Sequence, residues 1–274
     1  MGNVPVSISV RSGKNSGEVF RAMEESFRRA LRIEEEVSEF RPSSQLSLLN
    51  KEGAKRWIPI GKELGVILNT GRKISGQTRG AFDMTFASSK KTASYEDVEL
   101  DLERGRGRLR REGVVIGVSG IAKGYIVDQM SDSLLRQGFR EHLVNAGGDL
   151  RVRGRWQVGI RDPRHPEVSL CHLTLKNQSV STSGRYERGD HIVDPRTRTK
   201  VRRRDILSTT VVGQSTIETD ALATAAFILS AKEMEEFFSQ HPELILFIVD
   251  SEGKARRVRK GLDSAPCSPY TPSY

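Results

Sequence analysis

The chain is poor in the features that mark disulfide-rich, zinc-binding or membrane-spanning proteins. It has two cysteines in 274 residues, Cys171 and Cys267, which are too few and too far apart for a disulfide framework or a zinc site. It has no run of about 18 apolar residues, so no typical transmembrane segment is expected. The opening residues MGNVPVSISV lack the charged segment and the apolar core of a signal peptide. As written, the chain is therefore expected to be cytoplasmic.

Aromatic residues are also scarce, at 6% of the chain, and few of them lie near its basic clusters. The formal net charge is +9, with the excess concentrated at residues 104–111, 200–204 and 254–260. Nucleic-acid-binding domains usually combine such clusters with stacking aromatics or a recognisable motif, and neither is found here. We expect solvated surface at these clusters and no nucleic-acid partner. Nucleic-acid binding stays as an alternative that rests on the basic clusters alone.

The sequence contains both hydrophobic patterns that mark secondary structure, the alternation typical of strands and the spacing typical of helices. Residues 4–10 alternate apolar and polar side chains, which predicts a strand, whereas residues 17–40 and 62–75 show helical spacing. Another helix is predicted to start near Ile121, and a further one at residues 215–230, with Ser215 or Thr216 as its cap. Helices and strands do not alternate regularly, which favours an α+β fold. The remaining candidate strands are residues 142–145, 150–153, 156–161, 170–175, 208–212 and 244–250.

Two dense polar stretches lie between apolar runs, at residues 145–154 and 181–197, as expected of site loops on a rigid sheet. His191 lies in the second stretch, directly before Ile192 and Val193. A single histidine is more often structural than catalytic, so this position alone decides nothing. The segment RPSSQLSLLN (41–50), with Pro42 and several serines, is interpreted as a break after the first helix.

The stretch VIGVSGIAKGYIVDQM, residues 115–130, resembles an anion-binding turn. An apolar run leads into Gly117, Gly120 and Gly124, and a helical pattern follows. Free N–H groups and the helix dipole favour an anion at such a place. However, neither the P-loop order nor the dinucleotide fingerprint is present, because Lys123 precedes Gly124 and two residues separate the first two glycines. A tight turn with a packing glycine is the alternative.

Asp220 and Thr224 are four residues apart on a predicted helix and therefore share one face. A carboxylate and a hydroxyl side by side are hard oxygen ligands of the kind that Mg²⁺ binds. In the alternative interpretation, the Thr224 hydroxyl bonds back to the Asp220 carbonyl. An acid among apolar neighbours is costly to bury unless a cation meets it, so we also expect a cation near Asp220.

Taken together and in order, nine short segments resemble the FAD:protein FMN transferase (ApbE) family. Each motif is weak alone, but the ordered set spans nearly the whole chain. The segments are MGN (1–3), FRPSSQLS (40–47), GAFD (80–83), SGIAKGY (119–125), VNAGGD (144–149), VGIRDP (158–163), STSGRYER (181–188), HIVDPRT (191–197) and TDALAT (219–224).

The resemblance implies one ApbE-like domain over residues 1–262, with a mixed or antiparallel sheet and packed helices. Residues 263–274, rich in Pro and Ser, are expected to form a disordered tail. The implied activity is Mg²⁺-dependent transfer of the FMN part of FAD to a Thr or Ser hydroxyl of an acceptor protein, with release of AMP. Family members are often exported or attached to a membrane.

The resemblance also implies site residues, position by position. Gly120, through its carbonyl, together with Asp220 and Thr224 would bind Mg²⁺, and His191 would act near the transferred phosphate. The implied contacts to FAD are Met1, Phe40, Ala81, Phe82, Asp83 and Lys123.

One departure concerns Gly117, because the family usually has Asp at this position. If a polar contact to FAD is missing there, the chain could be a catalytically impaired FAD-binding protein. A further alternative at the same site is hydrolysis of the FAD pyrophosphate, with water in place of the acceptor hydroxyl.

Overall fold

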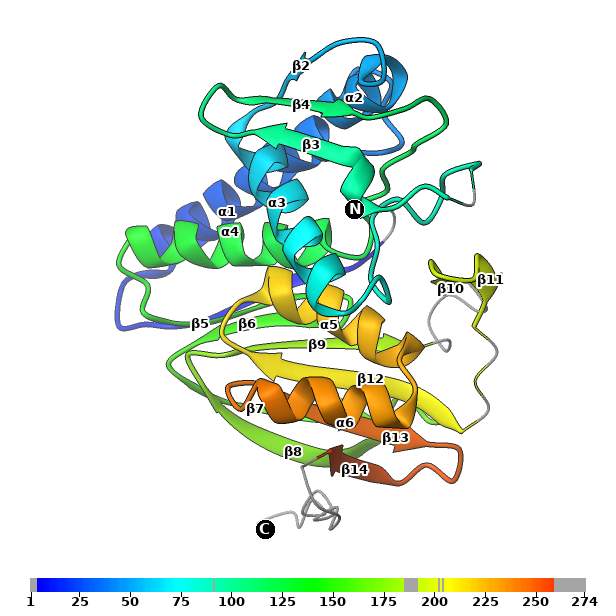
Figure 1. Ribbon diagram of the computed structural model, residues 1–274. Helices are drawn as coiled ribbons and strands as arrows, with labels where there is room; N and C mark the ends of the chain where they lie inside the picture. Colours follow the sequence, from blue (N-terminus) through cyan, green and yellow to red (C-terminus); the bar gives the residue numbers. More distant parts are fainter. Residues whose placement is uncertain (1–3, 91, 185–191, 202, 204, 259–274) are drawn as a thin grey trace.

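The computed structural model describes residues 4–90, 92–184, 192–201, 203 and 205–258, and its centre is a seven-stranded sheet (Figure 1). Every neighbouring pair of strands in this sheet runs antiparallel. The α+β fold with an antiparallel sheet is therefore confirmed. In sheet order the strands are β1 (Val6–Arg11), β5 (Glu141–Ala146), β6 (Asp149–Arg153), β9 (Ser179–Gly184), β12 (Ile206–Gly213), β13 (Ile245–Asp250) and β14 (Ala255–Val258).

Helices cover one face of the sheet. Helix α4 (Ala122–Arg136) packs on β5 and β6, and α5 (Thr216–Ile228) packs on β9 and β12. Helix α1 (Ser16–Val37) lies on α4, and α3 (Lys62–Gln77) contacts α5. Helix α6 (Ala231–Gln240) contributes to the same apolar core through Met234, Phe237 and Phe238. This layer of helices places α4 and α5 side by side directly above the sheet.

The opposite face is covered by a two-stranded hairpin, β7 (Arg155–Arg161) and β8 (Ser169–Lys176). A second apolar core forms between this hairpin and the sheet, with Val152, Ile160, Leu175, Val212 and Phe247 among its members. Strand β12 is therefore buried on both faces, which explains its almost continuous run of buried residues.

The chain between α1 and α4 builds a smaller unit above the helices. It contains α2 (Gln45–Glu52), the short helix η1 (Tyr95–Asp97) and a three-stranded sheet of β2 (Ile58–Pro59), β4 (Arg106–Leu109) and β3 (Val98–Asp101). Arginines of the basic cluster at 104–111 pair with acids of β3 and η1. These pairs are Arg104 and Arg106 with Asp101, Arg108 and Arg110 with Glu99, and Arg111 with Asp97. A separate hairpin is formed by β10 (Val193–Asp194) and β11 (Thr199–Lys200).

Several local predictions were wrong. The segment after residue 40, interpreted as a break, contains α2, because the Ser44 side chain accepts a hydrogen bond from the Ser47 amide and caps that helix. The polar stretch 181–197 is not all loop, since its first residues belong to β9. The predicted tail, residues 263–274, and the domain boundary at 262 lie outside the described residues.

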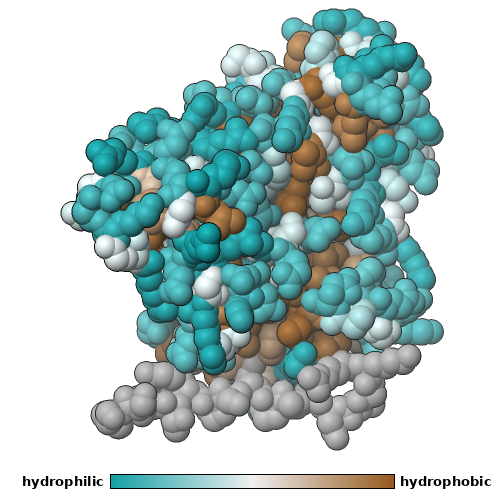
Figure 2. All heavy atoms as spheres, turned by 90° about the vertical axis from the view of Figure 1, so that its left-hand side faces the viewer, coloured by the Kyte–Doolittle hydropathy of each residue, from teal (hydrophilic) through white to brown (hydrophobic). Residues whose placement is uncertain are grey.

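The face of the molecule in Figure 2 is largely hydrophilic, in agreement with the many charged residues of the chain. Hydrophobic residues show mainly in a narrow band that runs down it. Among the described residues, none of the helices combines the length and the apolarity that crossing a membrane would require.

Candidate active site

The candidate site lies where α4 begins beside α5. Gly124, in the first turn of α4, donates its backbone N–H to Oδ2 of Asp220 on α5, at 2.9 Å. A Cβ atom at position 124 would lie 2.3 Å from the Thr216 carbonyl oxygen and 2.8 Å from Cβ of Asp220. Only glycine permits this approach of the two helices. The contact places the Asp220 carboxylate at the positive end of α4, where it satisfies an otherwise free N–H group.

Lys123 lies between two buried carboxylates. Its Nζ is 3.7 Å from Oδ1 of Asp220 and contacts Oδ2 of Asp149, the first residue of β6. Asp149 and Asp220 are 1% and 5% exposed. The cation that burial of Asp220 requires is therefore Lys123. When all three groups are ionised, the cluster keeps one negative charge in excess, which favours a further cation.

Sequence reasoning did not select Asp149, although it lies in the quoted polar stretch 145–154. Its carboxylate reaches Lys123 only because β6 passes beneath the start of α4. The signal available in the sequence was the acid at the end of the VNAGGD segment.

Thr224 and Gly120 complete this side of the site. The Thr224 hydroxyl lies 3.3 Å from the Asp220 carbonyl oxygen and 3.2 Å from Oγ of Ser183 on β9. The alternative prediction for Thr224 thus describes a real contact. A hydroxyl that donates to the carbonyl and accepts from Ser183 still has one lone pair for a ligand. A Cβ atom at Gly120 would lie 3.7 Å from Oγ1 of Thr224 and 3.4 Å from the Phe82 ring, so the predicted residues come together.

These groups fit a magnesium ion. Mg²⁺ is usually held in proteins by one or two carboxylates, while substrate phosphates and waters fill its other positions. The described residues contain no cluster of three or more His, Cys, Asp or Glu side chains that could hold a metal by themselves. The Asp220 carboxylate, the Thr224 hydroxyl and the nearby backbone of Gly120 match the sparse oxygen set of Mg²⁺ rather than a zinc or calcium cage.

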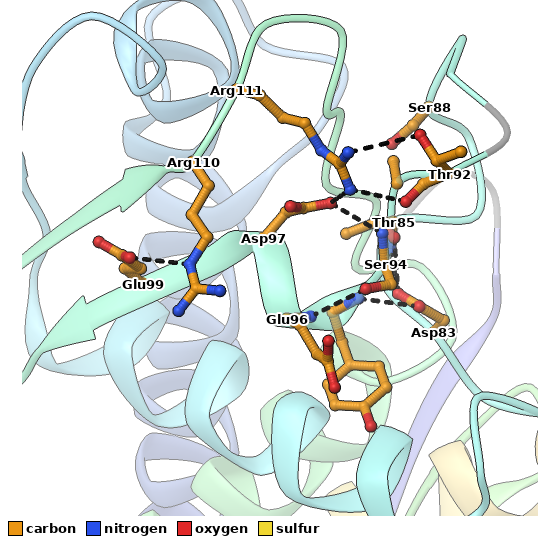
Figure 3. A network of polar contacts seen from close by, with 12 residues as sticks. Asp83, Thr85, Ser88, Thr92, Ser94, Glu96, Asp97, Glu99, Arg110 and Arg111 are labelled. Atoms are coloured by element: carbon orange, nitrogen blue, oxygen red, sulfur yellow. Dashed lines mark hydrogen bonds and ion pairs between the residues drawn. The ribbon is translucent and has the colours of Figure 1, made fainter.

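The loop after α3 carries Ala81, Phe82 and Asp83, all buried. Both carboxylate oxygens of Asp83 accept hydrogen bonds from the protein: Oδ1 from the amide and hydroxyl of Thr85, at 2.7 and 2.8 Å, and Oδ2 from the Tyr95 amide, at 2.9 Å (Figure 3). Burial raises the pKa of Asp83, and these hydrogen bonds act against that shift. The contacts support a positioning role for Asp83, whereas Phe82 faces Gly120.

The other predicted site residues are not part of this cluster. Phe40 lies between α1 and α2 with 82% of its surface exposed, where a planar ring system could pack against it. Met1 and His191 lie outside the described residues.

Comparisons with known proteins agree with this fold. The family model of the ApbE family matches residues 1–248. The FAD:protein FMN transferase of Vibrio cholerae is 24% identical over 257 residues, covering 80% of this chain and 77% of its own. That of Escherichia coli K12 is 22% identical over 300 residues, covering 90% and 85%.

Solved structures match over nearly the whole chain. The ApbE protein of Thermotoga maritima superimposes with a TM-score of 0.81 at 26% identity, covering 92% of this chain and 93% of that one. The apo flavinyl transferase ApbE of Pseudomonas stutzeri has a TM-score of 0.78 at 22% identity, covering 93% and 94%. The α+β fold is thus shared with these proteins. The chain belongs to the ApbE family, as its ordered motifs predicted.

Proposed function

We propose that this protein is an FAD:protein FMN transferase that uses Mg²⁺ and modifies a Thr or Ser hydroxyl of an acceptor protein. The observation that carries this proposal is the buried cluster of Asp220, Lys123 and Asp149 beside Thr224 and Gly120. In the reaction, the acceptor oxygen bonds to the phosphorus of the FMN half. The bond from that phosphorus to the bridging oxygen breaks, AMP leaves, and the hydroxyl proton passes to a base.

The side chains of the cluster have separate roles in this proposal. Asp220 and Thr224, with the Gly120 carbonyl, would hold Mg²⁺. When bound there, Mg²⁺ supplies Lewis-acid stabilisation of charge on the phosphate oxygens. Lys123, at the start of α4, adds a positive charge beside the same oxygens, and transfer of a phosphoryl group depends mainly on such neutralisation and on positioning. Asp149 holds the Lys123 ammonium in place through its ion pair.

The remaining roles concern the rings of FAD and the proton. Met1, Phe40, Ala81 and Phe82 would contact the flavin or adenine rings, and Asp83 would keep the loop of Phe82 in position. His191 would accept the proton of the acceptor hydroxyl, since a neutral imidazole is a good general base.

Incubation of the protein with FAD, Mg²⁺ and a flavin-acceptor domain tests the proposal. The acceptor should become covalently fluorescent and gain the mass of one FMN, and AMP should be released in equal amount. A folded protein that gives no adduct would contradict the proposal. Release of AMP and FMN without acceptor would indicate FAD hydrolysis, and tight binding without turnover would indicate an FAD-binding protein.

Asp220→Asn should lower the rate of adduct formation by about 100-fold or more, because a metal ion contributes several kcal/mol to the barrier. The amide keeps the shape of the side chain but removes its charge. Glu218→Gln is the matched control, since Glu218 lies on the same helix and pairs with exposed Lys73, at 3.5 Å. Rates measured over a range of Mg²⁺ concentrations should show weaker Mg²⁺ dependence in the Asp220 variant alone. Equal rates in both variants would remove Asp220 from the metal site.

A further inference from the structure

Glu39 is a half-buried acid beside the glycine-rich stretch that leads into α4. It follows Ser38, the C-cap residue of α1, and precedes Phe40. The Ser119 side chain and the Val118 backbone lie near its carboxylate, and their N–H and O–H groups lower its pKa. Burial raises the pKa of Glu39 more than these two donors lower it. An ionised carboxylate has about four acceptor sites, so two protein donors leave it able to accept more.

This carboxylate occupies the space that a side chain at position 117 would use. A Cβ atom built on Gly117 would lie 2.8 Å from Oε2 of Glu39 and 3.0 Å from the Phe86 ring. Gly117 does not have a positive φ angle, so its backbone would accept any residue. A side chain at position 117 would therefore meet the end of the Glu39 side chain and the Phe86 ring, and not an unfavourable backbone conformation.

The backbone around Gly117 is held from two sides, which fixes Glu39 relative to the site. Asn50 of α2 accepts a hydrogen bond from the Ile116 amide, at 2.8 Å, and donates to the Ile116 carbonyl, at 2.9 Å. The Gly117 amide donates to the Met84 carbonyl, at 2.8 Å. Gly120, which faces Thr224, is only three residues further along the chain. The Glu39 carboxylate and the Phe86 ring therefore lie on the same side of Gly117, three residues before Gly120 in the chain.

We propose that Glu39 is an FAD-contacting residue, and that it supplies from the end of α1 the carboxylate that family members usually carry on residue 117. The inference rests on the proposed function and adds one contact to it. Glu39 accepts a hydrogen bond from an N–H donor on a ring of FAD, either the adenine amino group or the flavin imide. The absence of Asp at position 117 is thereby compensated and does not make the protein catalytically impaired.

Moving the carboxylate from position 39 to position 117 tests the inference. The affinity for FAD is measured by titration calorimetry. Glu39→Ala should weaken FAD binding by about 10- to 100-fold, which is the change expected when a hydrogen bond to a charged group is lost. Gly117→Asp alone should also weaken it, because the new side chain meets the Glu39 carboxylate and the Phe86 ring. The double variant should recover most of the lost affinity. Glu35→Ala is the matched control, since the Glu35 side chain is 59% exposed near the same end of α1.

Titrations with ADP and with FMN separate the two possible donors. An adenine contact predicts that Glu39→Ala weakens ADP binding by the same factor as FAD binding, and a flavin contact predicts this for FMN. Thermal unfolding of every variant reports whether the fold is kept. Unchanged FAD affinity in folded Glu39→Ala, or no recovery in the double variant, overturns the inference while leaving the transferase proposal intact. A wild-type protein that binds no FAD would overturn both.

Discussion

Among single residues, His142 on β5 has both ring nitrogens in hydrogen bonds while its side chain is completely buried. Nδ1 lies 2.8 Å from the Phe139 carbonyl oxygen, and Nε2 lies 2.8 Å from Oγ of Ser131. Because a carbonyl only accepts, Nδ1 carries the hydrogen and Nε2 accepts from the serine. Burial lowers the pKa of His142 from its ordinary value of 6.5, and the nearby positive charge of Arg153 adds to the shift. The folded protein therefore keeps this ring neutral.

Stability should fall as the pH drops below about 6.5, because His142 then binds a proton in the unfolded chain but not in the folded one. Urea unfolding between about pH 5 and pH 8 measures this dependence. In His142→Gln the slope of unfolding free energy against pH should be smaller. His165→Gln is the control, since the His165 side chain is 64% exposed. Equal slopes in the wild type and His142→Gln would show that another group is responsible.

How well the site could be predicted differs from residue to residue for a physical reason. Asp220 and Thr224 share a helical face through spacing alone, so the sequence sufficed to pair them. Asp149 and Glu39 reach the site from a strand and a helix end that are distant in sequence. Such contacts depend on tertiary packing, which a single sequence does not specify.

At the scale of elements, the close approach of α4 and α5 determines the geometry of the site. Gly124→Ala should destabilise the protein by about 2 kcal/mol and lower transferase activity, because the added methyl group must push α5 away from α4. Chemical denaturation and the adduct assay would measure the two effects.

Gly76→Ala provides a matched helical control for this prediction. At Gly76, a Cβ atom would meet only the Tyr95 ring, at 3.9 Å, which is an ordinary contact. This variant should be neutral or stabilised by up to ~1 kcal/mol, as for glycine replaced by alanine within a helix. A Gly124 variant as stable and as active as the Gly76 variant would contradict the role of the helix crossing.

The start of α5 is capped by a side chain from α4. Oδ2 of Asp128 accepts from the Ile217 amide, at 3.0 Å, and Oδ1 accepts from the Thr216 hydroxyl, at 2.7 Å. Arg151 on β6 lies 3.8 Å from the same carboxylate and is itself buried. Ser215, at the predicted cap position, makes no side-chain hydrogen bond to the helix backbone and instead donates to Asp128. One buried acid thus joins α4, α5 and the sheet.

Asp128→Ala should lower the free energy of unfolding by about 3 kcal/mol or more, because it removes the cap and takes the nearby carboxylate away from the buried Arg151 charge. Asp132→Ala, one turn further along α4, removes an ion pair whose acid is 40% exposed and should cost at most about 1 kcal/mol. Urea titrations of both variants test the difference. Similar losses in the two variants would contradict the capping role.

Strongly periodic elements could be predicted, and elements with polar sequences could not. Helix α1 alternates apolar and charged faces over many turns, so tertiary context was not needed to find it. Strand β9, with the sequence SVSTSG, is nearly free of large apolar residues, and it is a strand because β6 and β12 pair with it on both sides. Helices α2 and α6 begin with serine caps, which also resemble loop residues in a sequence.

At the scale of the whole molecule, the β10–β11 hairpin is tied to the loop that follows Asp83. The Arg198 guanidinium donates to the carbonyl oxygens of Thr85, Phe86 and Ala93, with 2.8 Å to Thr85. The loop near Phe82 and the hairpin that follows residue 191 are therefore held together by one side chain.

Arg198→Ala should accelerate hydrogen exchange at the amides of residues 85–90 by about 10-fold or more, since it removes charge-assisted hydrogen bonds to that loop. Arg196→Ala is the control, because Arg196 pairs with Asp194 and Glu233 and, among the described residues, forms no ion pair with the loop. Exchange followed by mass spectrometry on both variants would reveal the difference. Unchanged exchange in Arg198→Ala would show that the loop is stable without the hairpin.

The pairing of β1 with β5 bears on the order in which the chain can fold. Val6 pairs with Ala146, and α2, η1 and the three-stranded sheet of the smaller unit are encoded between these strands. During synthesis β1 leaves the ribosome long before its partner and stays unpaired while nearly half of the chain is made. The contacts within the smaller unit join residues that are closer in sequence. This unit can therefore fold first and shorten the loop that must close when β1 pairs with β5.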